Sequence, residues 1–160
     1  VDAGALEYLS KKENLDFPQI MNILNQESGV LGISKNLSSD FRELKDAEIK
    51  YNDTAALARE IFAYRVAKYI GSYAAAMNGV DNIVFTAGVG ENDSDIREEI
   101  CSYLEFLGIT IDEVKNREQG EAVRISDGTS RVNVLVIKTN EELEIAREAA
   151  ELVRGLKKEE

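Results

Sequence analysis

Residues 85–92 read Phe-Thr-Ala-Gly-Val-Gly-Glu-Asn, and Gly88 and Gly90 stand between an apolar run and an acidic stretch. Glycine allows positive φ and lets a ligand reach backbone N–H groups, so this corner could hold a phosphate-bearing ligand. The pattern lacks the third glycine of the dinucleotide fingerprint and the Gly-Lys-Ser/Thr of a phosphate loop. A plain strand-to-helix turn is therefore an equally open interpretation at this point.

Acidic residues narrow the kind of ligand that this corner could take. Glu91, Asp93 and Asp95 crowd the expected start of the next helix. Acids at that position stabilise a helix by about 0.3–1 kcal/mol each, and they compete with a bare phosphate for the same N–H groups. We therefore expect a ribose, a base, or a phosphate that already carries Mg²⁺.

A second corner follows another apolar run, at residues 139–142. Thr139 and Glu142 have the spacing of a capping box, in which each side chain satisfies the other's backbone N–H. Glu141 has no such structural role, and its carboxylate could hold Mg²⁺ directly or through water. The alternative is a solvated acid in the first turn of a helix.

A third candidate is the stretch Ser39-Asp40-Phe41-Arg42. An aspartate can accept hydrogen bonds from sugar hydroxyls, and an arginine can stack on a base or bind phosphate. The structural alternative is an aspartate that caps a helix, followed by a surface arginine.

Composition excludes several other kinds of site. The chain has 160 residues with no histidine and a single cysteine, so it cannot build a Ser-His-Asp or Cys-His triad or a thiolate zinc site. We interpret Cys101 as an apolar filler in a helix, suited to a reducing compartment such as the cytoplasm. The net charge of −11 opposes binding to nucleic acids and to anionic membranes.

Hydrophobic periodicity and cap residues predict the elements that position these corners. We expect helices over 1–13, from 16–18 onward, and over 38–45, 54–78, 92–107 and 140–154. We expect strands over 83–85, 122–125 and 132–137, and a loop or short extended structure over 28–34.

The order of these elements predicts an α/β architecture in one domain, residues 1–160. In such sheets ligands bind beyond the carboxyl ends of the strands, where two of the three corners lie. We expect residues 66–77 to be largely buried, because they are apolar on most sides. We also expect Leu143, Ala146, Ala150 and Val153 to form the core-facing stripe of the last helix.

Taken together, the three corners resemble a known family. The stretch NIVFTAGVGENDSDIREEICSYLEFLGI is similar to the C-terminal nucleotide-binding half of acetate kinases. So are SSDFREL, FAYRVAKYIGSYAAAMNGVD and VLVIKTNEELEIARE, in the family's order and spacing. The strings FTAG-x-GEN and TNEE-x-x-IAR are far more specific than a generic glycine loop.

The resemblance implies a fold, a reaction and a set of residues. The fold is the ribonuclease H-like domain of the acetate/sugar kinase, actin and chaperone ATPase superfamily, here incomplete and without its first strands. The reaction moves the γ-phosphoryl group of ATP to acetate, with Mg²⁺, and gives acetyl phosphate and ADP. The resemblance assigns Glu141 to the metal. It assigns to the nucleotide Asp40, Phe41, Arg42, Gly88, Val89, Gly90, Glu91 and Asn92.

The resemblance also implies what is missing. Family members are about two and a half times as long, and the acetate-binding half with its catalytic arginines, aspartate and histidine has no counterpart here. We therefore expect no catalytic residue in this chain, no activity from the chain alone, and one edge of the sheet left unpaired. The family implies a homodimer that uses this half. Alternatives are a non-catalytic interaction module, or a propionate or butyrate kinase.

Overall fold

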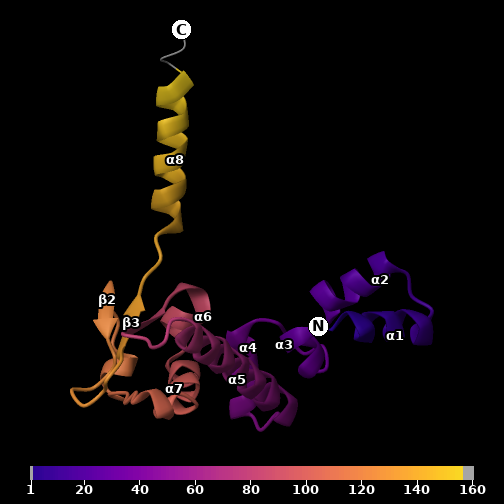
Figure 1. The fold of residues 1–160 in the computed structure, drawn as a ribbon, viewed down its shortest axis with the longest axis horizontal. Coiled ribbons are helices and arrows are strands. Elements are labelled where there is room, and N and C mark those ends of the chain that lie inside the picture. Colours follow the sequence, from indigo (N-terminus) through magenta and orange to yellow (C-terminus); the bar gives the residue numbers. More distant parts are fainter. Residues whose placement is uncertain (1, 157–160) are drawn as a thin grey trace. The chain divides into compact units, whose positions relative to one another are not determined.

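The computed structural model describes residues 2–156. The chain divides into two compact units, Val1–Tyr73 and Ala74–Glu160, here called unit 1 and unit 2 (Figure 1). Unit 1 is helical, and unit 2 carries the sheet.

Unit 1 contains helices whose ends follow local cap chemistry. They are α1 (Ala3–Glu13), α2 (Phe17–Asn22) with a π-helical turn (Ile23–Glu27), α3 (Gly29–Ile33), α4 (Phe41–Ile49) and most of α5 (Asp53–Ala76). Asp16 caps α2 in a full capping box with Gln19, and Pro18 lies in the first turn, as the sequence predicts. The loop expected over 28–34 is wrong, because Gly29 turns the chain with φ of 62° and α3 follows directly.

The long helix α5 is confirmed, but its expected burial is wrong. Within the stretch 66–77 the small residues Ala67 and Ala74 are buried, whereas Tyr69, Tyr73 and Met77 are 56–64% exposed. The buried side of this helix accepts small side chains, so the large ones point to solvent. The helix ends at Asn78 and Gly79 as predicted, and both have positive φ.

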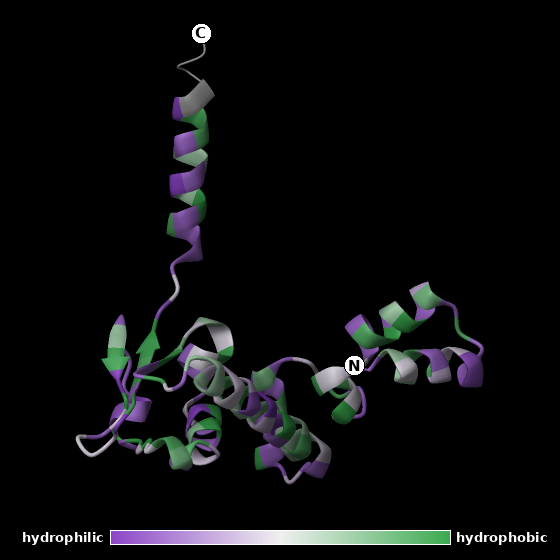
Figure 2. Cartoon of the chain, viewed as in Figure 1, coloured by the Kyte–Doolittle hydropathy of each residue, from purple (hydrophilic) through white to green (hydrophobic). Residues whose placement is uncertain are grey.

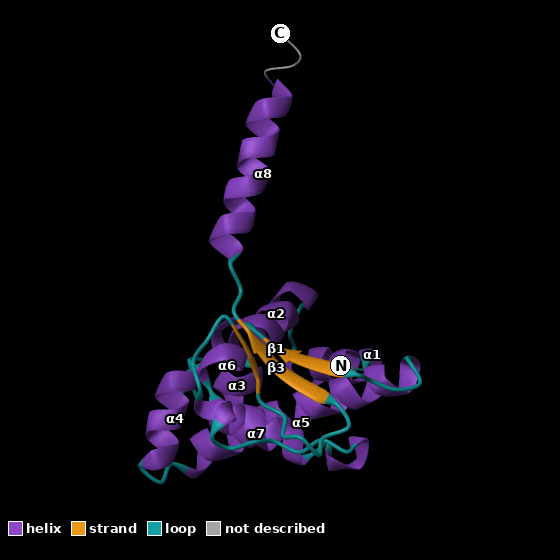
Figure 3. Cartoon of the chain, turned by 90° about the vertical axis from the view of Figure 1, so that its left-hand side faces the viewer, coloured by secondary structure: helices purple, strands orange, loops and turns teal. Residues whose placement is uncertain are grey.

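The sheet of unit 2 has three strands in the order β1-β3-β2, namely β1 (Asn82–Phe85), β3 (Asn133–Ile137) and β2 (Ala122–Arg124). Figure 3 labels the neighbouring strands β1 and β3. β1 runs parallel to β3, with Phe85 opposite Val136, and β2 runs antiparallel to β3. The two parallel strands therefore end at the same edge, and the chain leaves that edge at Thr86 and at Lys138. Among the described residues β1 pairs with β3 alone, which leaves the other side of β1 as a sheet edge.

One continuous helix was expected over 92–107, but the structure has α7 (Ser94–Ser102) and a separate 3-10 turn (Glu105–Leu107) there. An unexpected short helix, α6 (Ala87–Asn92), precedes them. The break between α6 and α7 lies at Asp93, whose backbone is extended and whose side chain accepts a hydrogen bond from Ile96 N at 3.2 Å. Asp93 thus starts a new helix instead of continuing the old one. Gly108 ends the 3-10 turn in the left-handed conformation, as predicted.

The core of unit 2 draws its side chains from the sheet, from α7 and from the segments that flank them. The strands contribute alternate residues to it, in agreement with their burial patterns. Its buried apolar side chains include Ile83, Phe85, Ile96, Ile100, Cys101, Leu104, Ile125, Val134 and Val136.

The last helix, α8 (Glu141–Leu156), forms as predicted, but its expected core stripe is wrong. Leu143 and Val153 are 43% and 54% exposed, and no residue of α8 whose exposure is described is buried. The apolar residues that run along α8 (green in Figure 2) therefore lack a covering surface in the described part of the chain.

Of the helices described, none is long and apolar enough to cross a membrane.

Candidate functional site

The glycine corner begins where β1 ends. Thr86 is extended, and α6 starts at Ala87. The residue of this corner with positive φ is Ala87, at 58°, so the expectation that the glycines supply positive φ is wrong. The glycines must be explained by what surrounds them.

The two glycines differ in their surroundings. A Cβ atom on Gly90 would lie 3.3 Å from the carbonyl carbon of Phe85 and 3.5 Å from its Cα and Cβ. Gly90 therefore lets α6 pack closely on the end of β1, which is a structural role. A Cβ on Gly88 would meet no atom within 4 Å. Among the described residues, no contact explains Gly88.

Glu91 ties the two corners of the sheet edge together. Its Oε1 accepts hydrogen bonds from Ala87 N at 2.8 Å, Thr139 N at 2.8 Å and Thr139 Oγ1 at 2.9 Å. The bonds from Thr139 and Ala87, with the charge of Lys138, hold the pKa of Glu91 below its usual value. The carboxylate thus joins the start of α6 to the end of β3.

The expected capping box at the second corner is wrong. Thr139 is engaged by Glu91, and the cap of α8 is Asn140, whose Oδ1 accepts a hydrogen bond from Leu143 N at 3.1 Å. Asparagine is among the best capping residues, so Asn140, directly after Thr139, is the feature of the sequence that indicates this cap. Glu142 is consequently not required for the cap.

An open pocket of about 440 Å³ lies between the two corners. Gly88 and Glu141 line it, together with Ala87, Thr139, Asn140 and Glu142. The space beside Gly88 therefore opens on a polar surface with two carboxylates. The described residues contain no group of three or more possible metal ligands. One or two carboxylates nevertheless suit Mg²⁺, which keeps several waters and takes further oxygens from phosphates.

The third candidate segment lies in unit 1. Asp40 caps α4 through Arg42 N at 2.8 Å, and its carboxylate also binds the Arg42 guanidinium at 3.1 Å and 2.6 Å. The hydrogen bonds from Arg42 lower the pKa of Asp40 to about 2. The capping role that the sequence suggested is confirmed, and the pair presents an exposed, oriented guanidinium.

Phe41 is held in place by a ring contact and by a hydrogen bond to its carbonyl oxygen. Its ring meets that of Phe62 edge to face, with centroids 4.5 Å apart. The buried Arg59 donates to the Phe41 carbonyl at 3.4 Å, and its Nε pairs with Glu48 at 2.6 Å. The segment from Asp40 to Arg42 is therefore fixed in unit 1, whereas the glycine corner and Glu141 come together in unit 2.

Comparison with known proteins decides the family. Residues 1–147 match the Acetokinase family. The chain belongs to the acetate kinase family. The acetate kinase of Lachnoclostridium phytofermentans is 53% identical over 153 residues, which are 96% of this chain.

Solved structures of the family agree with the fold. The acetate kinase of Porphyromonas gingivalis matches 96% of the chain with a TM-score of 0.86 and 44% identity. A propionate kinase from Francisella tularensis matches 92% of it with a TM-score of 0.84 and 41% identity. The chain spans 38% of the length of each of these two acetate kinases and 37% of the length of the propionate kinase.

In this member of the acetate kinase family, the glycine corner is also held by residues that the sequence did not indicate. Thr139 is the partner of Glu91, although they lie 48 positions apart. Arg97 and Asn116 hold the far end of α6 from within the core. Sequence spacing contains no signal for either pairing, because Thr139 meets Glu91 only when the sheet forms, and Asn116 meets Arg97 only when its turn packs against α7.

Proposed function

We propose that this chain is the nucleotide-binding part of an acetate kinase, which as a full-length protein transfers the γ-phosphoryl group of ATP to acetate and releases acetyl phosphate and ADP. Family membership supports the reaction. The observation that carries the site is Gly88, which has free space beside it and lines the pocket at the ends of the parallel strands. A glycine for which the described residues give no steric reason fits close approach of a ligand to the backbone.

In this proposal the backbone of residues 88–90 lies against the nucleoside and its α-phosphate side, and Asn92 lies there too. Glu91 contributes by holding the two corners together. Asp40, Phe41 and Arg42 of unit 1 stay predicted nucleotide residues by the family resemblance, and the oriented Arg42 guanidinium is of a kind that can stack on a base or bind a phosphate.

Glu141, with Glu142 beside it in the pocket lining, would hold Mg²⁺ directly or through water. The bound ion would neutralise charge on the phosphates during transfer. The chain's own residues position the nucleotide, and positioning is a large part of catalysis in phosphoryl transfer. The chain contributes no residue that we assign to the chemical step, so we expect the acetate pocket in the rest of the full-length protein.

Calorimetric titration with Mg-ADP tests this proposal. The full-length protein that carries this chain should bind Mg-ADP, and Gly88→Val should remove that binding because its side chain would occupy the space where the backbone meets the ligand. Gly128→Val is the matched control, because a Cβ on Gly128 also meets no atom within 4 Å, in the turn between β2 and β3. Unchanged binding by Gly88→Val, or no binding by the wild type, would refute the assignment.

An interaction module is the second candidate function. α5 exposes Tyr64, Tyr69 and Tyr73, and large exposed aromatics are typical of protein interfaces. A homodimer formed through this helix would bury them. Sedimentation of the full-length protein and of its Tyr69→Lys variant separates a dimer from a monomer. The acid that accepts the phosphoryl group is a separate question, since the similar Francisella tularensis protein is a propionate kinase.

A further inference from the structure

The short helix α6, which carries Gly88, is too short to be stable by itself. It has 6 residues, and isolated helices need about 12–15 residues to form even marginally in water. The last carbonyl groups of any helix also lack partners within that helix. The position of the glycine corner therefore depends on groups outside α6.

Arg97 satisfies the free end of α6 from within the core. Its side chain comes from α7 and the residue is 3% exposed. Nη1 donates to the carbonyl oxygens of Gly90 at 2.9 Å and Glu91 at 3.0 Å. A cation at a helix C-terminus is favourable, and hydrogen bonds from a charged donor are stronger than neutral ones. Burial lowers the pKa of Arg97, and the charges of Asp93 and Asp95 oppose that shift.

Asn116 orients the same guanidinium from the other side. Its Oδ1 accepts from Arg97 Nε at 2.8 Å, its carbonyl accepts from Nη2, and its Nδ2 donates to Ser94 O at 2.9 Å. Asn116 is 1% exposed, so these bonds are shielded from water. The hydrogen bonds use every nitrogen of the guanidinium and leave it one orientation.

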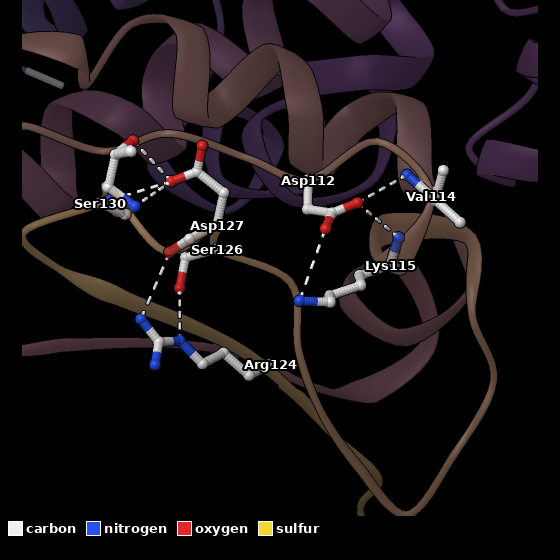
Figure 4. A network of polar contacts seen from close by, with 8 residues as sticks. Asp112, Val114, Lys115, Arg124, Ser126, Asp127 and Ser130 are labelled. Atoms are coloured by element: carbon white, nitrogen blue, oxygen red, sulfur yellow. Dashed lines mark hydrogen bonds and ion pairs between the residues drawn. The ribbon is translucent and has the colours of Figure 1, made fainter.

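The turn that carries Asn116 is itself fixed. Asp112 accepts hydrogen bonds from Val114 N and Lys115 N at 3.1 Å each, and pairs with Lys115 Nζ at 3.5 Å (Figure 4). Asn116 N then donates to the Asp112 carbonyl at 2.8 Å. A continuous chain of polar contacts therefore leads from this turn, through Asn116 and Arg97, to the carbonyls beneath the glycine corner.

We propose that Arg97, oriented by Asn116, is a positioning residue for nucleotide binding, because it fixes the end of the short helix that presents Gly88 to the pocket. The inference rests on the proposed nucleotide site. Arg97 touches the backbone of the corner and not the pocket, so it acts through α6. Lysine at this position keeps the charge but lacks the planar fork that reaches Asn116 and both carbonyls at once.

The experiment is steady-state kinetics of the full-length protein that carries this chain, with both substrates varied. Arg97→Lys should raise the KM for Mg-ATP about ten- to a hundredfold, since a small misplacement of a binding group has effects of that size. The KM for acetate should stay within about twofold, because α6 does not form the acetate pocket. Asn116→Leu removes the acceptor for Nε, so it should raise the KM for Mg-ATP by a factor similar to that of Arg97→Lys. Asn116→Asp keeps the acceptor for Nε and loses only the donor to Ser94 O, so its KM for Mg-ATP should rise less than that of Asn116→Leu.

The matched control is Arg124→Lys. Arg124 also donates to a side-chain oxygen and a backbone carbonyl, those of Ser126 at 3.0 Å and Asp127 at 3.4 Å, away from the glycine corner (Figure 4). Its KM for Mg-ATP should be unchanged. A lower kcat for Arg97→Lys with both KM values unchanged would mean a smaller folded fraction, and would overturn the proposal.

The remaining outcomes are also decisive. If Arg97→Lys does not fold, Asn116→Leu is measured by the same two KM values. If neither variant folds, Arg97 is a residue of the core and the proposal is overturned. A wild type that does not bind Mg-ADP would refute the proposed function itself, and this result needs no variant.

Discussion

The two glycines of the corner should respond in opposite ways to the same substitution. Gly88 lies inside α6 without positive φ, and a Cβ there meets no atom within 4 Å. Gly88→Ala should therefore stabilise the fold by about 0.5–1 kcal/mol, the usual gain from replacing a helical glycine. The same methyl group enters the pocket, so the affinity for Mg-ADP should fall.

Gly90→Ala should destabilise the fold. Its Cβ would lie 3.3 Å from backbone of Phe85, and Phe85 is held in the parallel pairing of β1 with β3. Overpacking of this kind costs about 1–3 kcal/mol, which exceeds the helix gain of about 0.5–1 kcal/mol. The net expectation is a loss of about 1 kcal/mol.

Denaturant unfolding and Mg-ADP calorimetry, on the full-length protein and both variants, measure the two effects. The expected pattern is a more stable Gly88→Ala with weaker nucleotide binding, and a less stable Gly90→Ala. A less stable Gly88→Ala would show that the space beside Gly88 is filled. A Gly88→Ala variant that binds Mg-ADP like the wild type would refute the role of this glycine in ligand approach.

Four further predictions follow from the contacts described. The carboxyl of Asp40 should titrate near pH 2 by NMR, and in Arg42→Ala it should move toward its ordinary value of about 3.9. Because the folded pKa is the lower one, the stability from this pair is present above about pH 4 and is lost as the pH falls toward 2. Burial raises the pKa of Cys101 to about 12, so a thiol reagent at about pH 8 should modify it only at the rate of unfolding; fast modification of the native protein would contradict this. Glu91→Ala should weaken both stability and Mg-ADP binding, because Ala87 N and Thr139 lose their acceptor. Glu98→Ala, at a position half-buried like that of Glu91, is its control. The purified chain alone should form no acetyl phosphate, and product above background in a coupled assay would contradict the expected need for the rest of the protein.

Local chemistry made much of the fold predictable. The caps at Asp16 and Asp40, and the helix ends at Asn78–Gly79 and Gly108, were all expected and are all present. Each depends on a side chain and a backbone group within a few residues. The strands were equally predictable, since a short apolar run between turn residues has few other uses in a small α/β unit.

Burial could not be predicted in the same way. The apolar periodicity of α8 and of the second half of α5 shows that each helix has an apolar side, but not that another element covers it. Covering needs a partner from elsewhere in the fold. The structure leaves Leu143, Val153, Tyr69 and Tyr73 exposed in the described part of the chain.

The sequence by itself determined where the chemistry lies, and the tertiary structure decided what each residue does there. Spacing located the glycine corner and the acids near it, because strand ends and turn residues are local signals. Only the folded sheet separates Gly90, which packs on Phe85, from Gly88, which faces the pocket. The sheet also brings Thr139 to Glu91, and the break at Asp93 lets Arg97 of α7 reach the end of α6. These contacts join residues distant in the chain or in different elements, so the hydrogen bonds that define the site exist only after folding.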